Sequence, residues 1–408
     1  MDKLNLGQTV AKLRRKMGIT QAELAAKLGV SNKAVSKWEN GGGYPDITLL
    51  PALSEVLGVS ADYLLKGDTQ GIVVAGDILV DIVNVLDKFP EKNMLANIIS
   101  TVHAVGGCVP NTIIDLARID SDIFLSAAGK VGNDENGRYV VSQMRKYGID
   151  VSRVITDENS VTASDNVMTD SRTGERTFFY AKGANGSFDI DDIDISALDC
   201  KIFHIGYILL LDALDSEDKE YKTRMARLLD MVSKKGIKTS IDVVSEDGER
   251  FAEKVIPALK YTDYVIINEV ESCRVSGLSP RDENGNICIR NIRKTMEKFF
   301  EFGVREKVIV HCAEAGFLMN KNGSFYASGS LILPDGYIKG SVGAGDAYAA
   351  ACLYGIYKGF EPMQMLEFAS AAAACNLSES DSVSGMKNRS EIEKLGKKYK
   401  RREIKEEC

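Results

Sequence analysis

Between about residues 72 and 390, short apolar segments rich in β-branched residues alternate with amphipathic segments of helical period. A strand that is apolar on both faces must be covered on both faces, and helices that connect parallel strands provide this cover. We therefore predict an α/β fold, with a parallel sheet between two helical layers. The strand-like runs are GIVVAGDILVDIV, KIFHIGYILLL, KTSIDVV, YTDYVIINE and KVIVHCA, and helices are expected at 218–235, 249–259 and 287–303.

Two segments of this region, 82–105 and 161–185, do not fit the alternation. Their threonine, valine and phenylalanine content is typical of strands, and we expect them to lie outside the main sheet as a small β lid. The charged C-terminal segment has helical periodicity. The expected organisation is a helical domain at 1–66, a polar linker at 67–71, an α/β domain at 72–393 and a charged helical tail at 394–408.

The N-terminal segment has apolar residues at helical spacing, separated by turns. Capping and turn residues predict five helices, of which the second and third are joined by a tight glycine turn. The signals are Leu6, Val10 and Leu13 on one helix face that ends at Gly18; Thr20 with Glu23 before a helix to Leu28; Gly29 and then Ser31 before a helix to Trp38; Pro45-Asp46 before a fourth helix; and Ser60 before a fifth.

Two helices joined by such a turn are the pattern of a DNA-binding helix-turn-helix. Over about 60 residues the segment TQAELAAKLGVSNKAVSKWENGGGYPDITLL and its flanks resemble the lambda-repressor/Cro-like (XRE-type) family. The resemblance implies that the second of these helices enters the major groove of double-stranded DNA, while its other side packs the domain. In this family pattern, phosphates are contacted by Gln21 and Ser31, base edges are faced by Asn32, Lys33, Ser36 and Lys37, and packing positions are Ala34, Val35 and Trp38.

The distribution of charge agrees with a DNA-binding N-terminus. Residues 1–66 carry nine lysines and arginines against six acidic residues, a net charge of +3, whereas the whole chain carries −7, so the remainder carries −10. A small basic module suits nucleic acid better than an acidic body does. One such module contacts few bases, so a homodimer on a two-fold symmetric site is expected. Binding of a protein instead of DNA is the alternative.

The segment GSVGAGDAYAAACLYGIY begins with small residues and continues as a strongly helical run. Small residues at a helix N-terminus leave backbone N–H groups free to surround an anion, such as a transferring phosphoryl group. Asp346 follows this cradle, where a carboxylate could accept the proton of an attacking hydroxyl. By itself this motif is weak, because glycine-rich turns between strands and helices are common.

Further motifs accompany it, in the order GDILVD, AVGGCVPNTIIDLARI, GKVGNDENG, GERTFFYAKGAN and INEVESCRVSG. Together they resemble the ribokinase-like (PfkB) carbohydrate kinases, from about residue 72 to 390. The resemblance implies ATP and Mg²⁺ as cofactors and a sugar or nucleoside as substrate. The implied roles are substrate binding by Asp81, Gly106, Gly107 and Asn111; placement of Mg²⁺, mainly through water, by Asn268 and Glu271; nucleotide binding by Ser341, Gly316 and Asn376; an anion hole of Gly343, Ala344 and Gly345; and catalysis by Asp346.

Structural roles are the alternatives to several of these assignments. Asp81 could be a strand-end turn residue, Asn111 a helix cap, and Asn268 with Glu271 the capping pair of the next helix. His204 and His311 are expected to pack or hydrogen-bond near the sheet.

The chain departs from the family pattern at three places. Members commonly read D-T-x-G-A-G-D, where this chain has Gly340, Ser341 and Val342. The branch that phosphorylates phosphosugars usually carries a lysine where this chain has Cys108, so a neutral sugar or nucleoside is expected. In the nucleotide segment 310–316, Glu314 could crowd or repel a triphosphate. The two hypotheses are therefore a kinase that also regulates transcription, and a non-catalytic regulator that uses the kinase fold as a sensor.

The eight cysteines are scattered and form no C-x-x-C pair, which argues against a disulfide framework or a zinc site. No run approaches the roughly 20 apolar residues of a membrane span. Both observations favour a reducing, cytoplasmic location.

Overall fold

The computed structural model describes residues 3–57, 64–65, 70–244 and 250–404. The N-terminal domain consists of α1 (Lys3–Lys16), α2 (Gln21–Leu28), α3 (Asn32–Glu39), the 3-10 turn η1 (Ile47–Leu49) and α4 (Leu50–Leu57). Thr20 and Glu23 form the expected capping box of α2. The segment expected to begin the fifth helix lies outside the described residues, although Leu64 and Leu65 are helical.

The main sheet has nine strands in the order β15-β14-β13-β12-β11-β8-β1-β4-β5. Seven of them are parallel, as predicted, but β14 and β15 extend the sheet as antiparallel edge strands. The three-residue turn after β13 is too short for a parallel crossover, so the next strand must return antiparallel. The strands are β1 (Gly71–Gly76), β4 (Leu125–Gly132), β5 (Asp150–Asp157), β8 (Cys200–Ile208), β11 (Lys238–Val243), β12 (Tyr264–Asn268), β13 (Lys307–His311), β14 (Ala315–Asn320) and β15 (Phe325–Gly329).

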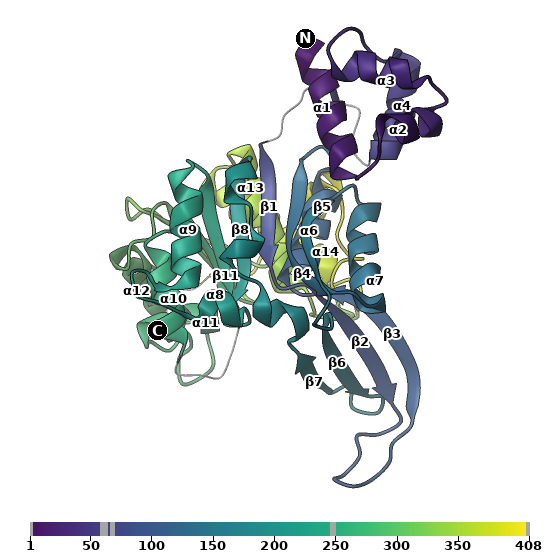
Figure 1. Cartoon of the computed structure of the whole chain (residues 1–408). Helices are drawn as coiled ribbons and strands as arrows, with labels where there is room; N and C mark the ends of the chain where they lie inside the picture. Colours follow the sequence, from purple (N-terminus) through teal and green to yellow (C-terminus); the bar gives the residue numbers. More distant parts are fainter. Residues whose placement is uncertain (1–2, 58–63, 66–69, 245–249, 405–408) are drawn as a thin grey trace.

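Helices cover both faces of this sheet, and each face has its own apolar core (Figure 1). One layer contains α6 (Cys108–Ile119), α7 (Glu135–Lys146), α13 (Ala344–Lys358), α14 (Pro362–Asn376) and α15 (Arg389–Lys398). The other contains α8 (Asp212–Asp215), α9 (Arg224–Lys234), α10 (Phe251–Leu259), α11 (Glu269–Ser276) and α12 (Ile289–Glu301), with the 3-10 turns η2 (Gly183–Ser187), η3 (Ile190–Asp192) and η4 (Ile195–Ala197).

The predicted lid is a separate four-stranded sheet that projects from the α/β body (Figure 1). Its strands are β2 (Leu79–Leu86), β3 (Ile98–Gly106), β6 (Ala163–Asp170) and β7 (Arg176–Ala181), in the order β3-β2-β6-β7. The α/β fold with a small β lid and an N-terminal helical domain is thus confirmed.

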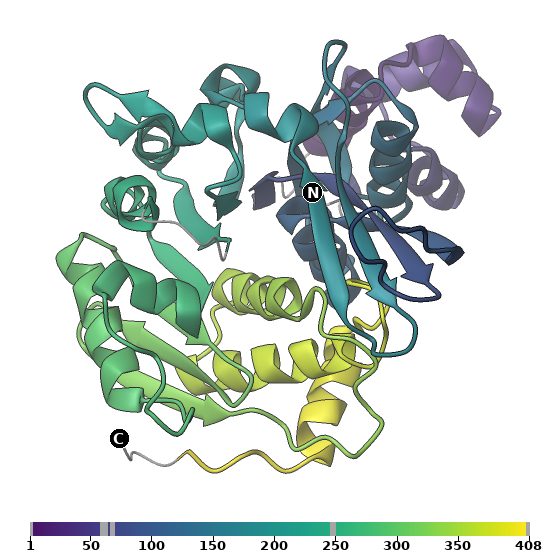
Figure 2. The same ribbon diagram turned by 90° about the horizontal axis from the view of Figure 1, so that it is seen from below.

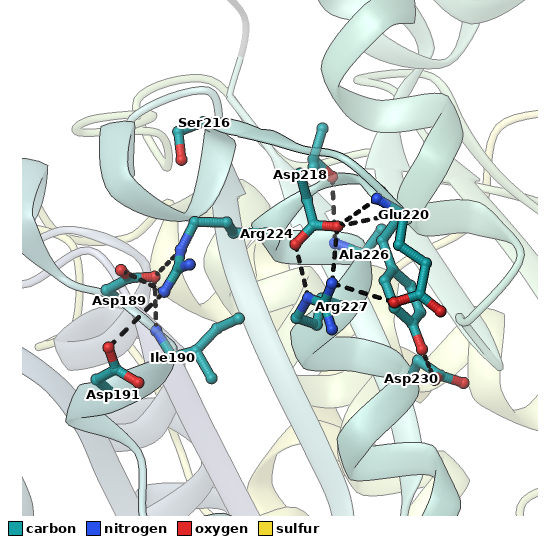
Figure 3. Close-up of polar contacts among 12 residues, drawn as sticks. Asp189, Ile190, Asp191, Ser216, Asp218, Glu220, Arg224, Ala226, Arg227 and Asp230 are labelled. Atoms are coloured by element: carbon teal, nitrogen blue, oxygen red, sulfur yellow. Dashed lines mark hydrogen bonds and ion pairs between the residues drawn. The ribbon is translucent and has the colours of Figure 1, made fainter.

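The helix expected at 218–235 begins later than predicted. A short hairpin of β9 (Glu217–Asp218) and β10 (Lys222–Thr223) precedes α9. Asp218 accepts backbone N–H bonds from the turn and pairs with Arg227 at 2.6 Å, as Figure 3 shows. Thr223 then caps α9. Local side-chain bonds of this kind compete with helix formation.

Of the described part of the expected helical tail, residues 394–398 are helical, as the end of α15, and residues 399–404 are not. After α15 ends at Lys398, the chain runs extended beside the 330–332 segment (Figure 2), where backbone bonds join Lys400 to Ile332 and Arg402 to Ser330.

Six cysteines of the described residues are free, but Cys288 is disulfide-bonded, contrary to expectation. Among the described residues, no helix is long and apolar enough to cross a membrane.

Candidate functional site

Steric crowding at the start of α13 explains why a small residue is needed there. Gly343 has a left-handed φ of 74°, and a Cβ there would lie 2.6 Å from the side chain of Ser382. Only glycine fits this turn at low cost. The helix can therefore begin at Ala344 with no bulky side chain over its first N–H groups, an arrangement that favours an anion, although the Ala344 N–H itself donates to the Ser341 carbonyl at 3.3 Å.

Asp346 lies in the first turn of α13 and is only 5% exposed. Its carboxylate accepts a hydrogen bond from Asn111 Nδ2 at 2.9 Å and from the Tyr207 hydroxyl at 3.2 and 3.3 Å. Burial raises the pKa of Asp346 to about 7, although both hydrogen bonds oppose the rise. A carboxylate that titrates near neutrality is suited to accept a proton during catalysis.

Asn111 does not cap α6, because the N-cap position is Gly107. Its amide instead donates to Asp346 and its oxygen accepts from the Ser382 hydroxyl at 2.8 Å. The helix-cap alternative for Asn111 is therefore wrong. The structure brings Asn111 and Asp346 together across 235 residues of sequence.

Gly106 and Gly107 allow the start of α6 to approach two aspartates. A Cβ at Gly106 would lie 2.6 Å from Asp81 Oδ1, and one at Gly107 would lie 2.7 Å from Asp77 Oδ2. Burial and neighbouring aspartates raise the pKa of Asp77 and of Asp81 to about 7. This part of the site offers carboxyl oxygens as acceptors, and a polyhydroxylated molecule carries the matching donors.

Asn268 and Glu271 form the capping box at the start of α11, so the structural alternative for this pair is observed. The Glu271 N–H donates to Asn268 Oδ1 at 2.9 Å, and the Asn268 N–H donates to Glu271 Oε2 at 3.0 Å. Nearby Asp242 has its pKa raised well above the usual value by burial and by the carboxylates of Glu271 and Asp346. A set of oxygen donors with mutually repelling charges fits a hard divalent cation.

A cavity of about 450 Å³ adjoins the start of α13. Its walls are largely apolar, and Ser341, Ala344 and Gly345 line the end toward the helix. Its other lining residues are Glu269, His311, Cys312, Ala313, Ser330, Leu331, Leu333, Ile338, Tyr348, Ser370, Ala373, Ala374, Leu377 and Arg402. An apolar slot that ends at a helix N-terminus can take a flat ring with an attached phosphate chain.

Two residues expected at the nucleotide do not line this cavity. Asn376 is buried and donates to the Val342 carbonyl at 3.0 Å, so it braces the loop before α13. Gly316 lies in β14, where a Cβ would come within 2.0 Å of the Tyr348 hydroxyl. Contrary to expectation, neither residue lines the cavity. Asn376 supports the loop before α13, and Gly316 leaves room for Tyr348, which does line the cavity.

Glu314 does not present a free negative charge at the cavity. Arg281 donates to both of its carboxylate oxygens, at 2.8 and 3.1 Å, and also to Glu269 at 2.8 Å. The Arg281 guanidinium lowers the pKa of Glu314. The expected repulsion of a triphosphate is therefore offset by a paired cation.

The helix-turn-helix presents part of its expected DNA face to solvent. Asn32, Lys33 and Lys37 are exposed on α3, whereas Val35 and Trp38 are buried in the domain core as predicted. The other polar positions are engaged within the domain: Ser31 Oγ accepts from Ala34 N, Ser36 Oγ from Asn40 Nδ2, and Gln21 Nε2 donates to Glu39 at 2.7 Å.

Five residues at the site were missed by sequence reasoning: Asp77, Tyr180, Asn185, Tyr207 and Asp242. Tyr180 and Asn185 donate to Asp77 Oδ1 from the lid and from η2. Asp77 follows β1 directly and Asp242 lies near the end of β11, and a carboxylate at the end of a parallel strand is a signal that the sequence does contain. Nothing in the sequence distinguished Tyr207.

Comparison with known proteins gives two matches along the chain. The pfkB family carbohydrate kinase matches residues 69–389, and a helix-turn-helix family matches residues 10–64. A 5-dehydro-2-deoxygluconokinase of Clostridium perfringens is 27% identical over 281 residues, which cover 66% of this chain and 77% of the relative.

Solved structures show the same fold. Ribokinase from Thermotoga maritima superposes with a TM-score of 0.66 at 22% identity, covering 80% of this chain and 99% of that one. Arabidopsis thaliana ribokinase, solved with ribose and ATP, gives a TM-score of 0.66 at 20% identity with the same coverage.

Proposed function

The chain belongs to the pfkB family of carbohydrate kinases and carries an N-terminal helix-turn-helix domain, and from this membership we propose that it phosphorylates a sugar or nucleoside hydroxyl with ATP and also binds specific DNA sequences. The observation that carries the enzymatic proposal is the environment of Asp346. This carboxylate lies in the first turn of α13, is bonded to Asn111, acts on the pKa of Asp77 and Asp81, and directly follows Ala344 and Gly345, which line the apolar cavity.

In the proposed reaction the acceptor hydroxyl attacks the γ-phosphorus of ATP. A new oxygen–phosphorus bond forms, the bond to the ADP oxygen breaks with its electron pair, and the hydroxyl proton passes to Asp346. The N–H group of Gly345, in the first turn of α13, faces the charge that develops on the phosphoryl oxygens. Asp81, Gly107 and Asn111 hold the acceptor, and the cavity that Ser341 lines holds the nucleotide.

Asn268 and Glu271, which also form the capping box of α11, would hold Mg²⁺ mainly through water. Bound Mg²⁺ supplies neutralisation of the phosphate charge during transfer. Asp242 adds a further carboxyl group near Glu271, and burial, together with repulsion from the carboxylates of Glu271 and Asp346, raises its pKa.

We propose a neutral acceptor. Asp77, Asp81 and Asp165 form an acidic cluster beside the start of α6, and each has a raised pKa, with burial as the largest cause. Cys108, which occupies the place of a possible phosphate-binding lysine, is fully buried and hydrogen-bonds within the protein to Thr112 and His204. An anionic group would meet these aspartates without a compensating lysine at position 108.

The test is a panel of neutral sugars and nucleosides incubated with ATP and Mg²⁺, with release of ADP coupled to an optical readout. We expect turnover with at least one neutral acceptor and weaker turnover with its phosphorylated analogue. Absence of turnover across the panel, combined with thermal stabilisation by one of the ligands, would support the alternative of a non-catalytic sensor.

For DNA recognition we propose a homodimer formed through the lid. One face of the lid carries exposed apolar side chains from β3 and β7, Val102 at 59% and Phe178 at 57% exposure, and the strand register aligns these two residues through Val83 and Val167. Patches of this kind commonly mark protein interfaces. Light scattering on the intact chain is expected to give the mass of a dimer, and a monomer mass for Val102→Lys with Phe178→Lys would locate the interface on this face of the lid.

We also propose that acceptor binding changes DNA affinity through α6. This helix begins at Cys108, next to Gly107, and carries Asn111, and both of these residues are proposed to hold the acceptor. The loop that follows the helix carries Phe124, which packs against the core of the helix-turn-helix domain. A further cavity of about 370 Å³ lies at this junction, between Leu13 and Met17 of the DNA-binding domain and Ile149 of the kinase domain. A shift of α6 on acceptor binding would therefore reach the DNA-binding domain directly.

A further inference from the structure

The carboxyl end of β8 has an unusual backbone. Tyr207 has a φ of +59° and Leu209 a φ of +93°, so two residues with side chains occupy the left-handed region within three positions. Such conformations are uncommon outside glycine and asparagine, and they persist only where the surrounding structure enforces them. They cluster at functional sites, so the contacts of these residues are informative.

Two features enforce this turn. The buried carboxylate of Asp215 accepts the backbone N–H of Leu209 at 2.9 Å and of Leu211 at 3.2 Å. The neighbouring strand β11 also loses its register opposite this point, between Ile241 and Val243. Irregularities in strand pairing next to active sites often redirect a side chain.

The redirected side chain is that of Tyr207, and its hydroxyl reaches Asp346 on α13. It lies 3.2 Å from Oδ1 and 3.3 Å from Oδ2, so the two carboxylate oxygens share one donor. Asn111 supplies the second donor, to Oδ2, from α6. Burial and the nearby carboxylates raise the pKa of the Tyr207 hydroxyl well above its usual value, so this group donates across the accessible pH range.

We infer that Tyr207 is a positioning residue for phosphoryl transfer: its hydroxyl orients the Asp346 carboxylate toward the acceptor and stabilises it as an anion, and the left-handed turn exists to place it there. This inference rests on the kinase activity proposed above. Asn111 fixes one oxygen of the carboxylate and Tyr207 bridges both, so the two donors together define the plane of the base.

The direction of the pH effect follows from the groups around Asp346. Its pKa is raised to about 7 by burial, and the Tyr207 and Asn111 hydrogen bonds act to lower it. The other titratable groups that face it are acidic or neutral: Asp77 on β1, Asp81 on β2, Cys108 and Asp115 on α6, Asp242 on β11, and His311 on β13 beside Gly345. Loss of the Tyr207 hydroxyl therefore raises the pKa of Asp346 further, and the base is protonated over a wider range of pH.

Tyr207→Phe keeps the ring and removes the hydroxyl. For the wild type we expect kcat/KM to rise with pH through about 7, where Asp346 loses its proton. For Tyr207→Phe we expect the midpoint of this rise to lie about one pH unit higher. Relative to the wild type, kcat/KM of the variant is then roughly tenfold lower at pH 6.5 and within about threefold of it at pH 8.5. Tyr354→Phe is the matched control, because Tyr354 is also a buried tyrosine in contact with an aspartate, Asp120, but it lies on α13 away from the site.

A second readout separates failure of this inference from failure of the proposed function. The carboxyl stretch of protonated Asp346, identified by its loss in Asp346→Asn, can be titrated by infrared spectroscopy without turnover. A higher midpoint in Tyr207→Phe than in wild type supports the inference even if no acceptor is phosphorylated. An active wild type with the same pH limb and the same infrared midpoint in Tyr207→Phe would overturn it, as would a loss of activity that is uniform across pH.

Discussion

Asp346→Asn is expected to lower kcat by about three orders of magnitude while the protein remains folded, because an amide of the same shape cannot accept the hydroxyl proton. Asparagine fits the same volume at the start of α13. It also removes a buried carboxylate whose pKa is raised to about 7, so stability at neutral pH should change little or increase. Steady-state kinetics and thermal unfolding measure the two effects.

Asp120→Asn is the matched control for this change. Asp120 interacts with the opposite end of α13, through Lys358 at 3.0 Å and Tyr354 at 3.4 Å, so its variant should retain kcat. If Asp346→Asn kept wild-type kcat, Asp346 would not be the base. If it lost acceptor and nucleotide binding together with its fold, the loss of activity would have a structural cause.

Removal of two exposed polar side chains of α3, in the double variant Asn32→Ala with Lys37→Ala, should abolish sequence-selective DNA binding. Both side chains are exposed, whereas Gln21 is bonded to Glu39 inside the domain. Each good base contact contributes about 1–3 kcal/mol of discrimination, so their joint loss should reduce selectivity by roughly 100-fold or more. The measurement is binding to DNA selected from random sequence, at a fixed salt concentration.

The control for this variant removes the same two residue types elsewhere. Lys321 and Asn322 are exposed in the turn between β14 and β15, so Lys321→Ala with Asn322→Ala changes the charge identically without touching α3. This control should bind selected DNA as the wild type does. Equal binding by the α3 variant would show that α3 does not read bases.

The layered architecture was predictable from local sequence because buried parallel strands are apolar on both faces and connecting helices are amphipathic. The same local signals marked the helix-turn-helix, where Thr20, Gly29 and Ser31 occupy cap and turn positions. The hairpin before α9 was missed because the bonds of Asp218 to the turn and to Arg227 leave no mark in periodicity.

At the site, motif resemblance predicted which segments converge but not where each side chain points. Asn376 and Gly316 lie in the expected segments, but neither faces the cavity. Asn376 hydrogen-bonds to the loop before α13, and Gly316 leaves space for the Tyr348 hydroxyl. The contact of Tyr207 with Asp346 spans 139 residues and depends on a left-handed backbone, which no local pattern reports. Roles that require a direction in space therefore had to come from the folded chain.

Coupling between the two modules is tested most directly by the operator affinity of the intact chain, measured without acceptor and at a saturating concentration of the acceptor that it phosphorylates. Because Phe124 joins the loop after α6 to the DNA-binding core, we expect the affinity to change at least fivefold, and the change to disappear in Phe124→Ala. The same affinity with and without acceptor, in a preparation that still phosphorylates it, would contradict a regulator whose DNA binding responds to its own substrate.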